Sequence, residues 1–255
     1  MAYKDWNSEQ LTVALNLYWK IPYNKISGSS NLKIKETAEI IGRSPGALAY
    51  KLMNFTSLDP EKQKTGNKGK HGASKADKII WDKYYNKWEE LAIDSYEVLS
   101  KMKANFLEEN IFFEEEIFSQ GLEKKQIVNI RINQADFRQR ILASYNEKCC
   151  ITGLNIKSLL VASHIVPWSK NDSERLNPRN GLCLNSIHDK AFDTGLLTIT
   201  SDFKIKLSKE ILNVFNHDVV QDIFIKYENK QIFLPERYLP SKDFLDYHNN
   251  NIFII

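Results

Sequence analysis

The chain has little cysteine and no long apolar run. Its 255 residues include 3 cysteines, which are too few for a disulfide framework or a four-cysteine zinc site. No apolar stretch approaches the roughly 20 residues of a membrane-spanning helix, and no basic and apolar leader opens the sequence. We therefore expect a soluble, cytoplasmic protein with no membrane partner and no structural zinc.

A strong excess of charge of either sign is also absent. The 35 Lys and Arg residues exceed the 32 Asp and Glu residues by 3, which gives a net charge of +3. This balance permits nucleic-acid binding without arguing for it, so the placement of the basic residues matters more than their sum. A chain of this length has room for one large or two ordinary domains.

Three short helices are predicted within residues 1–60. Apolar residues recur at helical spacing over residues 11–18, 34–41 and 48–55. Between the second and third stripes lies Gly42-Arg43-Ser44-Pro45, in which glycine suits a helix end, serine an N-cap and proline a first helical position. The spacing therefore predicts a tight turn between two helices.

The second and third predicted helices resemble a helix-turn-helix. Tyr50, Lys51 and Asn54 lie off the apolar stripe of the third helix, and Arg43 precedes it. These residue types suit contacts to DNA phosphates and bases. The alternative is a solvated face on a plain three-helix bundle.

Residues 61–124 are predicted to form a basic loop followed by a helical connector. Residues 61–75 are rich in Lys and Gly, which indicates a flexible loop. Its Lys68 and Lys70 either follow a phosphate backbone or are simply solvated. Aromatic residues over 81–91 have helical spacing, which predicts core packing rather than a base-stacking platform, and a further helix is predicted over 94–120.

From residue 125 the pattern changes again. Alternating apolar residues over 127–133 predict a short extended run, and residues 137–145 predict a helix that carries Arg138. Arg138 is a candidate phosphate contact, with an ordinary surface arginine as the alternative. Residues 196–207 alternate around Ser201-Asp202 and predict a β-hairpin.

The segment from residue 159 to residue 198 contains the most specific pattern. An apolar run ends at His164, Asn180-Gly181 opens a second run, and His188 lies early in a helix that Asn185 could cap. This order of strand, loop, strand and helix resembles the HNH (ββα-metal) endonucleases. It is most similar to their bacterial branch of predicted restriction endonucleases, whose members read AxHIxPW…RxNPxNGLCLxxxHDxAFDxGL.

The resemblance implies a role for each of these residues. His164 would act as the general base, since an imidazole with a pKa of about 6.5 is neutral at physiological pH. Asn180 would hold the intervening loop by hydrogen bonds to the backbone, although some relatives use this residue as a metal ligand. His188 would bind a divalent metal ion together with Asp193, with Asp189 as the other nearby carboxylate. Mg²⁺ or Mn²⁺ is expected, and Ni²⁺ or Zn²⁺ could occupy such a site.

The chain departs from the family at one position. Many HNH proteins have Asp or His immediately before the base, where it binds the metal, and this chain has Ser163. Serine is a weaker ligand for a divalent ion. The alternative to an active nuclease is therefore a DNA-binding regulator or defence sensor with an inactive HNH fold.

Together these features predict an α+β protein. A helical, helix-turn-helix-like DNA-binding domain would occupy residues 1–60, the connector residues 61–124, and a ββα-metal HNH nuclease domain residues 125–255. The expected activity is metal-dependent hydrolysis of double-stranded DNA by a restriction or anti-phage enzyme, with RNA or single-stranded DNA as alternative substrates. Because one site per chain must cut two strands, a homodimer is expected.

Overall fold

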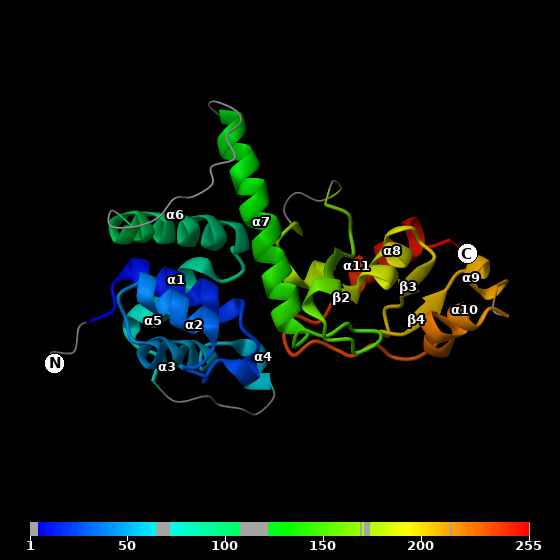
Figure 1. Cartoon of the computed structure of the whole chain (residues 1–255), viewed down its shortest axis with the longest axis horizontal. Coiled ribbons are helices and arrows are strands. Elements are labelled where there is room, and N and C mark those ends of the chain that lie inside the picture. The colour runs from blue at the N-terminus through cyan, green and yellow to red at the C-terminus, as the bar shows by residue number, and fades with distance from the viewer. Residues whose placement is uncertain are drawn as a thin grey trace. The chain divides into compact units, whose positions relative to one another are not determined.

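The chain forms two compact units, Met1–Gln139 and Arg140–Ile255. The computed structural model describes residues 5–64, 72–107, 122–168, 170, 174–214 and 216–254. The first unit is helical and the second contains strands and helices, so the fold is α+β as predicted (Figure 1). None of the described helices combines the length and the apolar character that a membrane crossing requires.

The first unit is built around a buried central helix. Its helices are α1 (Ser8–Trp19), α2 (Leu32–Ile40), α3 (Pro45–Thr56), α4 (Pro60–Lys64), α5 (Lys75–Tyr84), α6 (Trp88–Leu107) and the greater part of α7 (Leu122–Ser144). Every residue of α1 from Gln10 to Trp19 is buried, and this helix packs against α3, α5 and α6 (Figure 1). Such all-round burial requires a helix that is apolar on more than one face, as α1 is.

Local capping explains where these helices begin. Asn7 forms a capping box with Gln10 at the start of α1, and Ser74 forms one with Asp77 at the start of α5. Ser44 caps α3 with Pro45 at its first position, and Gly42 has a φ of +66° after α2. The predicted turn between the second and third helices is therefore confirmed.

Three predicted elements differ from the structure. Residues 81–91 do not lie on one helix, because Asn86 takes a φ of +60° and separates α5 from α6. The extended run predicted over 127–133 is wrong, since these residues belong to the continuous helix α7. No glycine or proline interrupts Leu122–Ser144, and most of its residues favour helix. The loop predicted over 61–75 is wrong at its start, because Pro60–Lys64 form the helix α4.

The second unit contains a two-stranded sheet followed directly by a helix. Strand β1 (Leu160–His164) pairs antiparallel with β2 (Gly181–Asn185), so that His164 lies opposite Gly181. Helix α8 (Ser186–Asp193) follows β2 without a loop and packs on both strands. Asn185 caps this helix, because its side chain accepts hydrogen bonds from the backbone of Ile187 and His188. This ββα unit positions the site described below.

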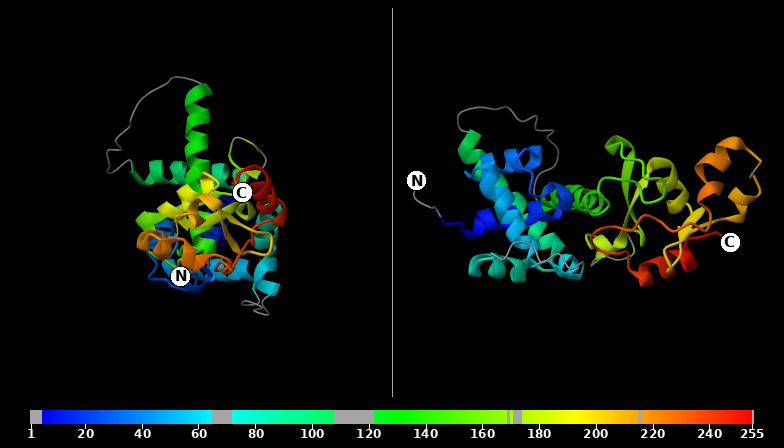
Figure 2. Two further views of the ribbon diagram at one scale, coloured as in Figure 1. Left: turned by 90° about the vertical axis from the view of Figure 1, so that its right-hand side faces the viewer. Right: turned by 90° about the horizontal axis from the view of Figure 1, so that it is seen from below.

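The remaining elements of the second unit follow α8 in the chain. Strands β3 (Leu197–Ile199) and β4 (Ile205–Leu207) form the predicted hairpin, and they are followed by α9 (Lys209–Leu212), α10 (Asp218–Ile223) and α11 (Lys242–Asn251). Helix α11 packs on β3 (Figure 2). Gly195, with a φ of +75°, lets the C-terminal segment approach the end of α8, because a Cβ there would collide with the Ile252 carbonyl oxygen.

Candidate functional site

A cleft of about 420 Å³ lies beside β1 and α8 in the second unit. Three elements bring its polar side chains together: β1 supplies Ser163 and His164, α8 supplies Asp189 and Asp193, and α11 supplies His248. Trp168 of the loop after β1 also lines it. The cleft therefore combines two imidazoles, one hydroxyl and two carboxylates.

The His164 ring is held at the end of β1. Its Nε2 lies 2.9 Å from the carbonyl oxygen of Arg175, and its ring meets the Trp168 ring edge-on with centroids 5.4 Å apart. A carbonyl oxygen only accepts hydrogen bonds, so Nε2 carries the proton and the neutral ring has its lone pair on Nδ1. Burial lowers the pKa of His164 below 6.5, although the Arg175 carbonyl opposes this. The ring is therefore in the form that a general base requires.

Asn180 fixes the loop between the two strands. Its Oδ1 accepts a hydrogen bond from the Val166 backbone amide at 2.8 Å, and its Nδ2 donates to the Val166 carbonyl at 3.1 Å. The backbone carbonyl of Asn180 also accepts from the Ile165 amide. The side chain is buried, so these bonds are shielded from water. They hold the loop in place immediately after His164.

The two carboxylates of α8 lie one turn apart and face the cleft. Burial raises the pKa of Asp189, and burial together with the charge of Asp189 raises the pKa of Asp193. Interaction with Ser163 lowers both, yet the buried Ser163 hydroxyl makes no hydrogen bond of ordinary geometry within the described residues. Two repelling carboxylates beside an unsatisfied hydroxyl form an oxygen-rich set of the kind that hard divalent cations prefer.

His188 lies on the buried face of α8 and does not line the cleft. Its Nε2 is 2.8 Å from the Ile223 carbonyl oxygen, and its Nδ1 is 2.8 Å from Nδ2 of Asn185. The ring is 1 % exposed and lies edge-on to Phe224 and Tyr227. Because Nε2 donates and Nδ1 accepts, the neutral ring has no lone pair left for a metal ion. The structure thus gives His188 a structural position rather than the metal-binding one expected from the sequence.

The helical period explains this difference. His188, Ala191 and Phe192 are the buried residues of α8, at spacing i, i+3 and i+4. Asp189 and Asp193 share the adjacent face at i and i+4. Asp193 therefore lies in the cleft as expected, and Asp189 takes the place proposed for His188. The spacing of His188, Ala191 and Phe192, which indicates the buried face of α8, can be read from the sequence.

The predicted DNA-contacting residues of the first unit lie in different environments. Tyr50 is exposed, whereas Lys51 and Asn54 are buried. The Lys51 ammonium is paired with the Asp77 carboxylate at 2.8 Å. Arg43 donates to Oε1 of Gln10 at 2.8 Å and lies over the Trp6 ring. Of the three positions on α3, the structure leaves Tyr50 at the surface.

The remaining residues predicted to contact DNA are Arg138, Lys68 and Lys70. Arg138 is half-buried on α7, and Lys68 and Lys70 lie outside the described residues.

The aromatic residues Trp81, Tyr84 and Trp88 are buried, as the helical spacing predicted. All three cysteines are buried as well. Neither Trp81 nor Trp88 can therefore serve as an exposed base-stacking surface.

The described ranges contain no group of three or more His, Cys, Asp or Glu side chains arranged as a metal centre. Comparison with protein families finds that residues 149–200 match the family described as HNH endonuclease. The match covers β1, β2 and α8, so the second unit contains an HNH endonuclease domain, while α1–α6 lie outside the matched range. None of the curated proteins compared with the chain matches it.

Proposed function

We propose that this chain is a metal-dependent DNA endonuclease whose general base is His164. The observation that carries the proposal is the hydrogen bond from His164 Nε2 to the Arg175 carbonyl, which leaves the basic lone pair on Nδ1. In the proposed reaction Nδ1 removes a proton from the attacking water as the new P–O bond forms. The P–O bond to the leaving oxygen then breaks, and the His164 imidazolium gives up its proton to solvent.

A divalent cation fits the residues of the cleft. Asp189 and Asp193 would hold it, with the Ser163 hydroxyl as a further oxygen donor, because a cation would offset the charge of Asp189 that raises the pKa of Asp193. When bound, the cation supplies stabilisation of the negative charge that develops on the phosphate and the leaving oxygen. Mg²⁺ or Mn²⁺ suits such an all-oxygen set, and this proposal replaces His188 by Asp189.

The finer proposals concern the DNA and the biological role. We infer that the α2–α3 helix pair contacts double-stranded DNA in helix-turn-helix fashion, with Tyr50 at the surface.

A homodimer is favoured because each chain has one proposed nuclease site and a duplex has two strands to cut. A restriction or anti-phage role would suit such an enzyme, and digestion of modified and unmodified phage genomes side by side would test it. Equal digestion of every genome would contradict a role that depends on base modification.

The direct test of nuclease activity uses the purified chain and supercoiled plasmid. We expect nicked and linear DNA with Mg²⁺ or Mn²⁺, and intact plasmid when EDTA is present. Retardation of the plasmid without strand breaks under every divalent ion would contradict the proposal. That result would favour the second candidate, a DNA-binding regulator with an inactive HNH fold, which the serine at position 163 motivates. Parallel reactions with RNA and single-stranded DNA define the substrate.

A further inference from the structure

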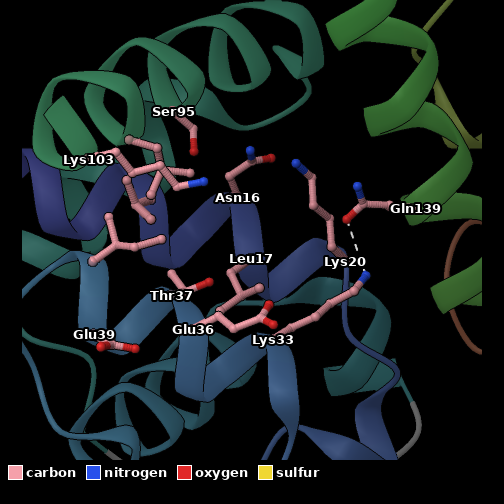
Figure 3. A pocket seen from close by; sticks show the side chains of 13 residues that line it. Asn16, Leu17, Lys20, Lys33, Glu36, Thr37, Glu39, Ser95, Lys103 and Gln139 are labelled. Carbon is pink, nitrogen blue, oxygen red and sulfur yellow. Dashed lines mark hydrogen bonds between the residues drawn. The ribbon is translucent and has the colours of Figure 1, made fainter. Parts of the chain in front are cut away.

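The first unit contains a pocket of about 740 Å³ that is separate from the nuclease cleft. It lies among α1, α2, α6 and α7, and a hydrogen bond of 3.2 Å from Lys33 Nζ to Gln139 Oε1 joins α2 to α7 at its margin (Figure 3). The volume falls within the range of small-molecule binding sites, roughly 300–1,000 Å³. The nuclease mechanism uses none of its residues.

One end of the pocket carries hydrogen-bond donors. Ser95 of α6 is 1 % exposed, and its hydroxyl has no hydrogen-bond partner within the described residues. The Lys103 side chain extends from the same helix towards Asn16 of α1 (Figure 3). Lys103 is half-buried and has no ion-pair partner among the described residues. An unsatisfied buried hydroxyl is costly, so this end of the pocket is suited to a ligand that brings a hydrogen-bond acceptor.

The charges differ between the two ends of the pocket. Lys20 is already neutralised by an ion pair with Asp136, so Lys103 supplies the uncompensated positive charge beside Ser95. Glu36 and Glu39 lie on α2 with one lysine, Lys33, so the pocket residues of this helix carry a net negative charge that would repel an anion. An anionic group would therefore bind at the α6 end rather than near α2.

The wall between these ends is aliphatic. Val13 and Leu17 of α1, Ile40 of α2 and Leu99 of α6 line the pocket, which indicates an apolar body for the ligand. The described lining residues include lysine but no arginine, and arginine is the side chain that pairs with a planar carboxylate through two parallel bonds. Donors from two helices surround the anionic end instead, which suits a tetrahedral group with several acceptor oxygens.

We propose that this pocket binds a small organic phosphate. The phosphate group lies among Lys103, Ser95 and Asn16, and the apolar body lies against Leu17, Ile40 and Leu99. This inference does not depend on the nuclease activity, because its residues belong to the first unit.

Isothermal titration calorimetry of the full chain in EDTA tests the proposal with phenyl phosphate as the probe. Phenol lacks the phosphate, benzoate replaces it by a carboxylate, and inorganic phosphate lacks the apolar body. We expect phenyl phosphate to bind at least about tenfold more tightly than each of the three. Absence of phenyl phosphate binding up to millimolar concentration, or equal binding of phenol or benzoate, overturns the proposal.

Substitutions locate the binding and separate it from folding. Lys103→Ala and Ser95→Ala should each weaken phenyl phosphate binding by about tenfold. The matched control Lys101→Ala, at an exposed position on the same helix, should change it less than about twofold. Because the Ser95 hydroxyl has no hydrogen-bond partner among the residues that the structure describes, Ser95→Ala should not lower the unfolding temperature. Asp189→Asn should leave binding unchanged, whereas unaltered binding in Lys103→Ala overturns the assignment.

Discussion

On helix α8, the adjacent residues His188 and Asp189 have different roles. Asp189 faces the cleft with Asp193, while His188 is buried with both ring nitrogens in hydrogen bonds. Burial raises the pKa of the nearby Cys149 thiol, but interactions with His188 and with the Thr152 turn together outweigh burial and lower that pKa to about 7. The imidazole thus connects α8, the turn after residue 148 and the carbonyl at the end of α10. Its removal should affect folding, whereas removal of a carboxylate should affect metal binding.

A comparison of Asp189→Asn with His188→Gln tests this division. Asp189→Asn should lower Mn²⁺ affinity and metal-dependent cleavage by about a hundredfold, and should not lower the unfolding temperature, because it relieves repulsion with Asp193. His188→Gln should cost about 1–3 kcal/mol of stability through lost buried hydrogen bonds and keep its Mn²⁺ affinity. Calorimetric Mn²⁺ titration and thermal unfolding measure both effects. Loss of Mn²⁺ binding in His188→Gln alone would contradict the assignment.

His248 makes the stability of the second unit depend on pH. Burial lowers its pKa from 6.5 to about 4, against the opposing Phe192 carbonyl. Its Nδ1 is 2.8 Å from the Thr198 hydroxyl, and its Nε2 is 3.1 Å from that carbonyl. Since the unfolded chain binds this proton at a higher pH than the folded chain, unfolding becomes easier as the pH falls from 6.5 to about 4.

The expected loss of unfolding free energy over this range is up to about 3 kcal/mol. His248→Gln keeps a donor and an acceptor but does not titrate, so its stability should depend less on pH over the same range. Urea unfolding of both proteins between pH 4 and pH 7 measures the difference. Parallel curves for the two proteins would show that His248 is not the responsible group.

At the scale of the elements, α3 and α5 are joined by a buried ion pair. Lys51 Nζ lies 2.8 Å from Oδ1 of Asp77, and Oδ2 of Asp77 accepts the Ser74 amide in the capping box of α5. Both side chains are buried, at 8 % and 0 % exposure. Removal of one partner leaves a buried charge unpaired, which is costly in proteins. Lys51 therefore contributes to helix packing rather than to a DNA-binding surface.

Lys51→Met should destabilise the first unit by about 3–5 kcal/mol. The double variant Lys51→Met with Asp77→Asn removes the stranded charge and should recover part of that loss, while the amide keeps an acceptor for the Ser74 cap. Denaturant unfolding of the three proteins gives the coupling energy. Tyr50→Ala, at an exposed position on the same helix, serves as the control and should change stability little. A double variant less stable than Lys51→Met would contradict the ion-pair account.

Local sequence patterns predicted much of the secondary structure. The caps at Ser44 and Asn185 and the hairpin predicted within 196–207 are found where residue types and spacing placed them. The break at Asn86 was missed because its positive φ has no proline or glycine to signal it. The helix over 127–133 was missed because short apolar alternation is compatible with more than one secondary structure.

The position of each side chain of the site, in the cleft or buried, depends on tertiary packing. His164 and Asp193 lie in the cleft as their positions in the motif suggested, since β1 and α8 are adjacent in the ββα unit. His188 and Lys51 were misplaced for a common reason: a polar side chain on a helix was assumed to be exposed, and each instead finds a buried partner. Such partners come from α10 and α5, which no local pattern identifies.

At the scale of the whole molecule, the cleft belongs entirely to the second unit. Each residue that lines it lies within Arg140–Ile255, and the α2–α3 helix pair lies within Met1–Gln139. The chemistry and the proposed DNA contacts are thus on separate units. The proposed homodimer would bring two such clefts to a duplex, one for each strand.

Mixing experiments test the proposed homodimer. When wild-type protein is mixed with an excess of the His164→Ala variant, most wild-type chains are in dimers that contain one competent site. We expect the product to shift from linear to nicked plasmid, and sedimentation to give twice the mass of one chain. Linear product at a rate strictly proportional to the wild-type share, from a protein that sediments as a monomer, would contradict the dimer.

Single-turnover cleavage of plasmid by His164→Ala, measured beside DNA retention, tests the central claim most directly. The account predicts that cleavage with Mn²⁺ falls by a factor of about 10²–10⁴, because the group that takes the proton from water is lost. DNA retention and Mn²⁺ affinity should stay at the wild-type level, since Asp189, Asp193 and the helical unit are unchanged. Cleavage by His164→Ala at the wild-type rate would contradict the assignment of this imidazole as the general base.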